Sequence, residues 1–139
     1  MKILSTLIFL VILSSHVYAQ SEIEHINNVL YDYIEGTANG APDRLKRAFD
    51  ENFNLYYVRN DSIQEWSGRQ YINGVKPGRK SNRIGKVLAI DYEGNAASAK
   101  VEILMPDRKR IYTDYFLLLK TGGQWKIVHK SFTYKNYPE

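Results

Sequence analysis

The chain has 139 residues, no cysteine and a formal net charge of +4. This length fits one domain with a single core, and the lack of cysteine excludes both a disulfide scaffold and a cysteine-ligated metal site. The small net charge does not favour a nucleic-acid partner.

The N-terminus has the pattern of an export signal. Met1 and Lys2 precede an apolar run at residues 3–13, and Val17-Tyr18-Ala19 supplies a signal-peptidase site before Gln20. The apolar run is too short to span a membrane. We therefore expect a signal peptide at residues 1–19, a mature domain at residues 20–139 without a membrane span, and a periplasmic or secreted location.

Two helices are predicted at the start of the mature domain. Ser21 begins an amphipathic pattern that continues through Tyr33, with Gly36 as the expected end. A second, short helix is expected from Pro42, with Phe49 on its apolar face. Asp50 and the two residues after it are expected to end this helix.

Strands dominate the rest of the chain. Residues 53–58 and 63–66 are predicted as strands, and the pair Ser67 and Gln70 predicts the capping box of a third helix. Alternating patterns separated by turns then predict four consecutive antiparallel strands. These are Ile84–Tyr92, Ala96–Met105, Arg110–Lys120 and Gln124–Tyr134. Helices followed by such strands indicate an α+β fold.

The last hairpin predicts specific cross-strand pairs. If residues 121–123 form a three-residue loop, Tyr115 lies opposite His129 and Asp114 lies opposite Lys130. The second pair would be an ion pair inside a largely apolar sheet. A slip of one residue in the register would remove this assignment.

Several segments together resemble the family named "putative lumazine-binding", within the nuclear-transport-factor-2-like (SnoaL-like) superfamily. They are Tyr33-Ile34-Glu35-Gly36, Leu45-Lys46-Arg47-Ala48-Phe49, Glu65-Trp66-Ser67, Ala99-Lys100-Val101-Glu102, Tyr112-Thr113-Asp114-Tyr115-Phe116 and residues 123–130. The resemblance implies a cone-shaped fold in which N-terminal helices pack on a curved antiparallel sheet, with a pocket between them. It also implies a homodimer formed through the open sheet face. At one position the chain departs from many relatives, with Asp50 in place of a histidine.

Asp114 and His129 are the candidate catalytic residues. Relatives of this fold use a pocket aspartate as a base, alone or with a histidine, which implies an isomerase or dehydratase type of reaction. However, an ammonium group beside Asp114 stabilises the carboxylate anion, so the pairing with Lys130 favours a structural or ligand-orienting role. For His129, a sheet residue bonded to Tyr115 is the favoured interpretation, and general-base catalysis is the alternative.

The predicted ligand-binding residues are aromatic and charged. The rings of Trp66, Tyr71, Tyr57 and Tyr33 can stack on a flat ligand or can equally form the core between helix and sheet, and the core is the favoured place for Tyr33. The full predicted ligand-binding set is Trp66, Tyr71, Tyr115, Asp114 and Lys130. No histidine pair or carboxylate cluster has the spacing of a metal site, and no cofactor is predicted.

Two basic clusters are predicted to lie in loops. The first comprises Lys76, Arg79, Lys80, Arg83 and Lys86, and the second comprises Arg108, Lys109 and Arg110. Such clusters can bind phosphate or an anionic membrane, but solvated loops that protect a sheet edge are the favoured interpretation.

Three functions remain open at this point. The favoured one is an exported domain without catalytic activity that binds a small aromatic or anionic molecule in its pocket. An isomerase or dehydratase that uses Asp114 or His129 is the first alternative. The second is a protein-interaction module that dimerises through its sheet.

Overall fold

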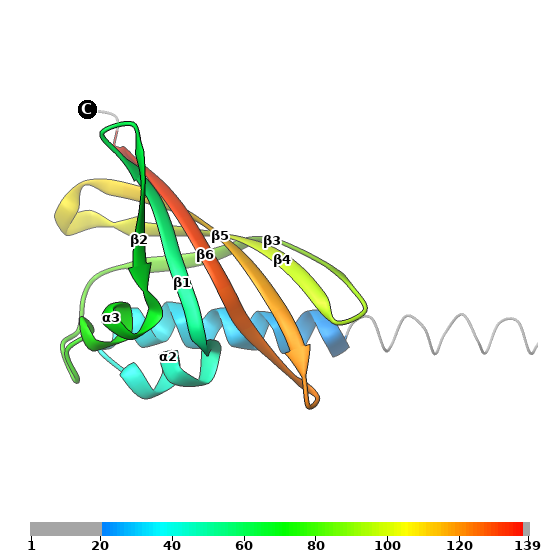
Figure 1. Ribbon diagram of the computed structural model, residues 1–139. Coiled ribbons are helices and arrows are strands. Elements are labelled where there is room, and N and C mark those ends of the chain that lie inside the picture. The colour runs from blue at the N-terminus through cyan, green and yellow to red at the C-terminus, as the bar shows by residue number, and fades with distance from the viewer. Residues whose placement is uncertain (1–20, 138–139) are drawn as a thin grey trace, which may run out of the picture.

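The computed structural model describes residues 21–137. The predicted signal peptide at residues 1–19 lies outside the described residues. The first element is a long helix over residues 21–38, whose buried stripe includes Ile26, Leu30 and Tyr33. This helix runs beneath the sheet and crosses its strands, as Figure 1 shows.

The helix passes through Gly36, so the prediction that it ends there is wrong. Gly36 instead allows the next helix to approach closely, since a Cβ at this position would lie 2.7 Å from Cδ2 of Leu45. The second helix, α2, covers Pro42–Ala48. Phe49, predicted in this helix, is the first residue of strand β1 (Phe49–Arg59).

Strand β1 forms a hairpin with β2 (Ser62–Ser67), which leads into helix α3 (Gly68–Asn73). The predicted capping box at the start of α3 is confirmed. The Gln70 backbone N–H donates to Ser67 Oγ, and the Ser67 backbone N–H donates to the Gln70 side chain. This cap fixes the point at which the chain turns from the sheet into the helix.

The four predicted consecutive strands are confirmed. They are β3 (Ile84–Glu93), β4 (Ala96–Met105), β5 (Arg110–Thr121) and β6 (Gln124–Asn136), and a short 3₁₀ helix, η1 (Pro106–Arg108), precedes β5. The full sheet has six strands in the order β2-β1-β6-β5-β4-β3. Strand β6 pairs with β1 in parallel, so the sheet is mixed and the expectation of a purely antiparallel sheet is corrected.

The predicted register of the last hairpin is wrong. Gly122 and Gly123 form a two-residue turn with positive φ at both positions, and a bulge follows between Leu117 and Leu118. Tyr115 therefore lies opposite Ser131, and His129 lies opposite Leu117. The predicted ion pair between Asp114 and Lys130 nevertheless forms, across a diagonal of the same sheet face.

The three helices lie on one side of the curved sheet, here called its inner face, as Figure 1 shows. The core forms between the inner face and the helices, and includes Phe53, Phe116 and Ile127. The architecture is thus an α+β fold with N-terminal helices packed on a curved sheet. Within residues 21–137, no helix combines the length and apolar character needed to cross a membrane.

Candidate functional site

A cavity of about 240 Å³, here called the inner cavity, lies between the inner face of the sheet and the helices. Its wall is mostly aromatic, with side chains from the first helix, α3, η1, the loop before β3 and five strands. The lining residues are Tyr33, Tyr57, Trp66, Tyr71, Arg83, Ile103, Met105, Arg108, Tyr112, Asp114, Lys130, Phe132 and Tyr134. An apolar hollow with a few polar groups is typical of a small-molecule site.

Three buried polar side chains form a hydrogen-bonded cluster in the wall of the inner cavity. The Tyr33 hydroxyl donates to Asp114 Oδ2 at 2.5 Å, and Lys130 Nζ donates to the Tyr33 hydroxyl at 2.8 Å. Lys130 Nζ also lies 3.2 Å from the same carboxylate oxygen. Asp114 is 1% exposed and Lys130 is 5% exposed, so bulk water screens this charge pair weakly.

The cluster leaves one strong acceptor unused. Asp114 Oδ1 is buried and has no hydrogen-bond partner among the described residues. Because a buried carboxylate oxygen without a partner carries a desolvation cost, such an atom at the edge of a cavity suits a ligand that donates a hydrogen bond.

Aromatic rings enclose the cationic end of Lys130. Its Nζ lies 4.7 Å from the ring centre of Tyr33, and 5.2 Å from those of Tyr71 and Phe132. These faces stabilise a cation that has few water contacts. Burial raises the pKa of Tyr33 well above its ordinary value, and electrostatic interactions with Asp114 and then Tyr71 raise it further. The Tyr33 hydroxyl therefore stays protonated at neutral pH.

Two arginines from separate loops line the inner cavity. Arg83 directly precedes β3, and Arg108 ends η1. A hydrogen bond of 2.7 Å between the side chains of Asn82 and Asp107 ties these two loops together. The sequence placed both arginines in basic clusters interpreted as solvated loops, because nothing in a local pattern shows that residues 25 positions apart meet.

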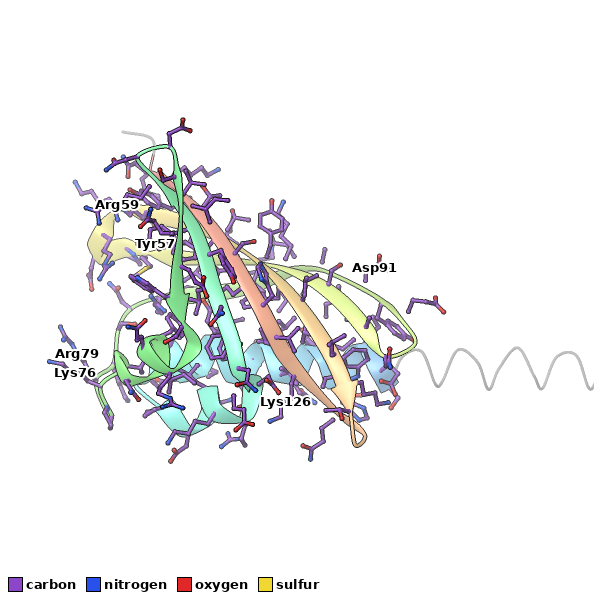
Figure 2. All side chains as sticks on the ribbon, viewed as in Figure 1. Tyr57, Arg59, Lys76, Arg79, Asp91 and Lys126 are labelled. Carbon is purple, nitrogen blue, oxygen red and sulfur yellow. The ribbon has the colours of Figure 1, made fainter. Side chains whose placement is uncertain are left out.

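Aromatic side chains of β1 and β2 form one side of the inner cavity. Trp66 is 46% exposed and packs edge-on against Tyr57, with ring centres 5.5 Å apart. Tyr57, labelled in Figure 2, stacks on Phe132 of β6 at 5.1 Å. The parallel pairing of β1 with β6 is what brings these rings together.

The structure brings together four of the five predicted ligand-binding residues. Trp66, Tyr71, Asp114 and Lys130 line the inner cavity, and Tyr57 and Tyr33 lie there too. Tyr115, the fifth, does not, because alternate residues of a strand point to opposite faces of the sheet.

The two candidate catalytic residues lie on opposite faces of the sheet. His129 stacks on Tyr56, with ring centres 5.0 Å apart, and borders a shallow hollow of about 430 Å³ together with Tyr115. Asp114 faces the inner cavity instead. A catalytic pair of Asp114 with His129 is therefore not formed.

The remaining basic residues of the first cluster do not line the inner cavity. Lys76 and Arg79 extend outward from the loop after α3, as Figure 2 shows. In the part of the chain that is described, no three histidine or acidic side chains come close enough to hold a metal ion.

Residues 21–133 match the protein family described as "Putative lumazine-binding". The chain belongs to this family. The match covers the helices, all of β1 to β5 and most of β6, and the resemblance found from the sequence is confirmed.

Proteins of known structure share the fold. A nuclear-transport-factor-2-like protein of unknown function from Shewanella baltica is 24% identical, with a TM-score of 0.74 over 86% of this chain and 96% of that one. A protein of the same description from Methylobacillus flagellatus is 25% identical, with a TM-score of 0.72 over 83% and 93% of the two chains. Among curated proteins, "Aldolase FrzH" from Cladobotryum sp is 25% identical over 119 residues, which are 85% of this chain and 94% of that protein.

Proposed function

We propose that the protein binds a small aromatic or anionic molecule in the inner cavity. The observation that carries this proposal is the buried Asp114 carboxylate in a mostly aromatic wall, where one carboxylate oxygen has no hydrogen-bond partner within residues 21–137. The rings can stack on a flat ligand, the carboxylate can accept a hydrogen bond from it, and Arg83 and Arg108 favour an acidic group.

Native mass spectrometry of the protein purified from its own host tests this proposal, since the spectrum reports a retained molecule directly. The matched variants are Trp66→Ala and Ile63→Ala, two exposed side chains of the same strand, of which only Trp66 lines the cavity. Loss of one stacking ring should weaken binding about fivefold in Trp66→Ala, and Ile63→Ala should leave it unchanged. An empty protein that binds nothing in a panel of small aromatic acids would contradict the proposal.

We also propose that the protein acts outside the cytoplasm, in the periplasm or as a secreted protein. The support is the export pattern at residues 1–19. N-terminal sequencing of the protein from its host should give Gln20 as the first residue. A chain that retains Met1 would contradict export by this signal.

Catalysis in the same cavity is the second candidate function. It is favoured by the buried Asp114, one oxygen of which accepts no hydrogen bond from the described part of the chain, and by the similarity to a protein named as an aldolase. An isomerase or dehydratase reaction with Asp114 as the base would have to proceed without His129, which lies on the other face of the sheet. Turnover that Asp114→Asn abolishes and His129→Gln leaves intact would support this candidate over simple binding.

A homodimer through the outer face of the sheet is the proposed physical state. Tyr115, Leu117 and Leu119 on β5 are each about half exposed, and the adjacent hollow carries both Asp91 and Lys100. Both signs of charge on one patch suit pairing with a second copy, since a twofold interface must complement itself. Leu117→Lys should then shift the mass in solution from dimer to monomer, whereas a monomeric parent protein would contradict the proposal.

A further inference from the structure

The position of Lys130 is unusual for a lysine that only balances charge. Lysine side chains are almost never fully buried, yet Lys130 is 5% exposed and contributes to the wall of a cavity. Four aromatic rings lie within 5.9 Å of its Nζ, which keeps water away from the amine. A lysine amine that is shielded from water and lies beside groups that can accept its proton can act as a nucleophile once that proton has moved.

We propose that Lys130 forms an imine with the carbonyl carbon of an aldehyde or ketone bound in the inner cavity. This inference rests on the proposed function, because the carbonyl compound must first enter that cavity. It adds a covalent step and a chemical class of ligand. Neither follows from binding alone.

Asp114 and Tyr33 supply the proton transfers that such a step requires. Asp114 Oδ2 lies 3.2 Å from Nζ and can take the proton that frees the amine. The Tyr33 hydroxyl bridges the two groups, 2.8 Å from Nζ and 2.5 Å from Oδ2, and can pass that proton toward the carbonyl oxygen. All the groups that move protons are therefore within hydrogen-bond reach of the amine.

The atoms and charges of the step balance without a further reactant. The Lys130 ammonium gives one proton to Asp114, and the neutral amine attacks the carbonyl carbon, so that a C–N bond forms and the carbonyl oxygen takes up that proton through Tyr33. The nitrogen then loses a second proton through the same pair of residues to this oxygen. Water leaves as the C=N bond forms, and the product is an iminium cation. Asp114 is again an anion and balances the iminium charge as it balanced the ammonium charge.

The wall of the cavity indicates which carbonyl compounds fit. A volume of about 240 Å³ suits a single-ring molecule, and the rings of Trp66 and Tyr71 suit a flat one. Arg83 and Arg108 line the same cavity and favour an acidic group on that ring. We therefore infer an aromatic aldehyde or ketone that also carries a carboxylate.

Borohydride trapping with 4-formylbenzoate tests the inference. Borohydride reduces an imine to a stable amine. Peptide mapping of the labelled parent protein, without any substitution, then shows which lysine carries the added group. At limiting aldehyde, Lys130 should be labelled at least about tenfold faster than the exposed Lys135, which lies on the same strand, because only Lys130 has the partners positioned for the reaction. Lys130→Arg should lose the adduct, and Lys135→Arg should keep it.

A ligand of the same shape without a carbonyl group separates the two proposals. 4-Methylbenzoate, which cannot form an imine, should bind in the cavity and slow the labelling of Lys130. If 4-methylbenzoate binds but 4-formylbenzoate labels Lys130 no faster than Lys135, the imine is refuted and the binding function stands. If neither compound binds, both proposals fail. The labelling of the parent protein decides the question even if Lys130→Arg does not fold.

Discussion

Two clusters of the same composition lie on the inner face of the sheet and differ in one respect. Each has a carboxylate, a lysine and an aromatic donor. At the first, Lys120 Nζ donates to Glu22 Oε1 at 2.6 Å and Trp125 Nε1 donates to Glu22 Oε2 at 2.8 Å. At the second, Tyr33 and Lys130 both approach Asp114 Oδ2, and Oδ1 has no partner among the described residues.

This difference separates a structural contact from a candidate site. The Glu22 cluster connects the first helix to β5 and β6 and satisfies both carboxylate oxygens, so it has no capacity left for a ligand. The Asp114 cluster is more deeply buried and lines a cavity, yet it retains an acceptor that no described residue uses. A chemically similar set of groups can thus stabilise a fold or receive a ligand, depending on how its hydrogen bonds are distributed.

The largest expected effect comes from removing the lysine of the buried cluster. Lys130→Met should destabilise the protein by about 3–5 kcal/mol, because it leaves the Asp114 carboxylate buried without a cation. Urea unfolding at neutral pH measures this loss.

The double variant Asp114→Leu/Lys130→Met provides the control. It replaces the ion pair by apolar side chains and should recover most of the lost stability. A loss below about 1 kcal/mol in the single variant would show that water reaches the carboxylate and that the pair is not buried in solution.

A smaller effect is expected from the aromatic donor of the same cluster. Tyr33→Phe removes the hydroxyl that links Asp114 to Lys130 and should cost about 2 kcal/mol by urea unfolding. Tyr31→Phe, an exposed position of the same helix, is the matched control and should change stability by less than about 0.5 kcal/mol. Equal effects at the two positions would refute a special role for the Tyr33 hydroxyl.

The smallest effect is expected at the Glu22 cluster and depends on pH. Hydrogen bonds from Lys120 and then Trp125 lower the pKa of Glu22 below its ordinary value of 4.5. The contribution of Glu22 to stability is therefore present above pH 4.5 and is lost as the pH falls through the lower folded-state pKa. In thermal unfolding, the Glu22→Gln variant should be less stable than the parent protein at neutral pH. The stabilities of the two proteins should converge in acid.

The two clusters should respond at opposite ends of the pH range. The raised pKa of Tyr33 means that the folded state keeps this proton while the unfolded chain loses it, so stability falls as the pH rises above about 10. Tyr33→Phe should lack this loss in alkali and still show the acid transition of Glu22. The same acid transition in Glu22→Gln would assign that transition to another group.

Local patterns in the sequence predicted the strands well and the pairing between them only in part. In the last four strands, apolar and polar residues alternate clearly, and turn residues separate one strand from the next. The limits of these strands therefore follow from the alternation and the turn residues. The predicted contact of Asp114 with Lys130 was right although its register was wrong. The two-residue turn alone would have placed Lys130 on the outer face, and the bulge beside Leu118 returns it to the inner one.

The parts of the candidate site that the sequence did not predict all depend on long-range contacts. The parallel pairing of β1 with β6 joins the first strand of the sheet to the last one along the chain, and no hairpin rule predicts it. Likewise, Arg83 and Arg108 line the same cavity although they come from separate loops, which the hydrogen bond between Asn82 and Asp107 ties together. Trp66 and Tyr71 are predicted as ligand-binding residues from their aromatic character. Tyr115 stands in the same predicted set as Asp114, although adjacent residues of a strand point to opposite faces of the sheet.

The place of β6 in the sheet has a consequence for how the chain folds. This strand is made last, yet it lies between β1 and β5. Until residues 124–136 are available, both neighbours present unpaired backbone groups that can pair with other chains. Contacts between such distant segments slow folding, because the entropy cost of closing a long loop comes before the contacts can form and stabilise the chain. A chain truncated just before Gln124 should therefore fail to form the sheet and should aggregate through these two open edges.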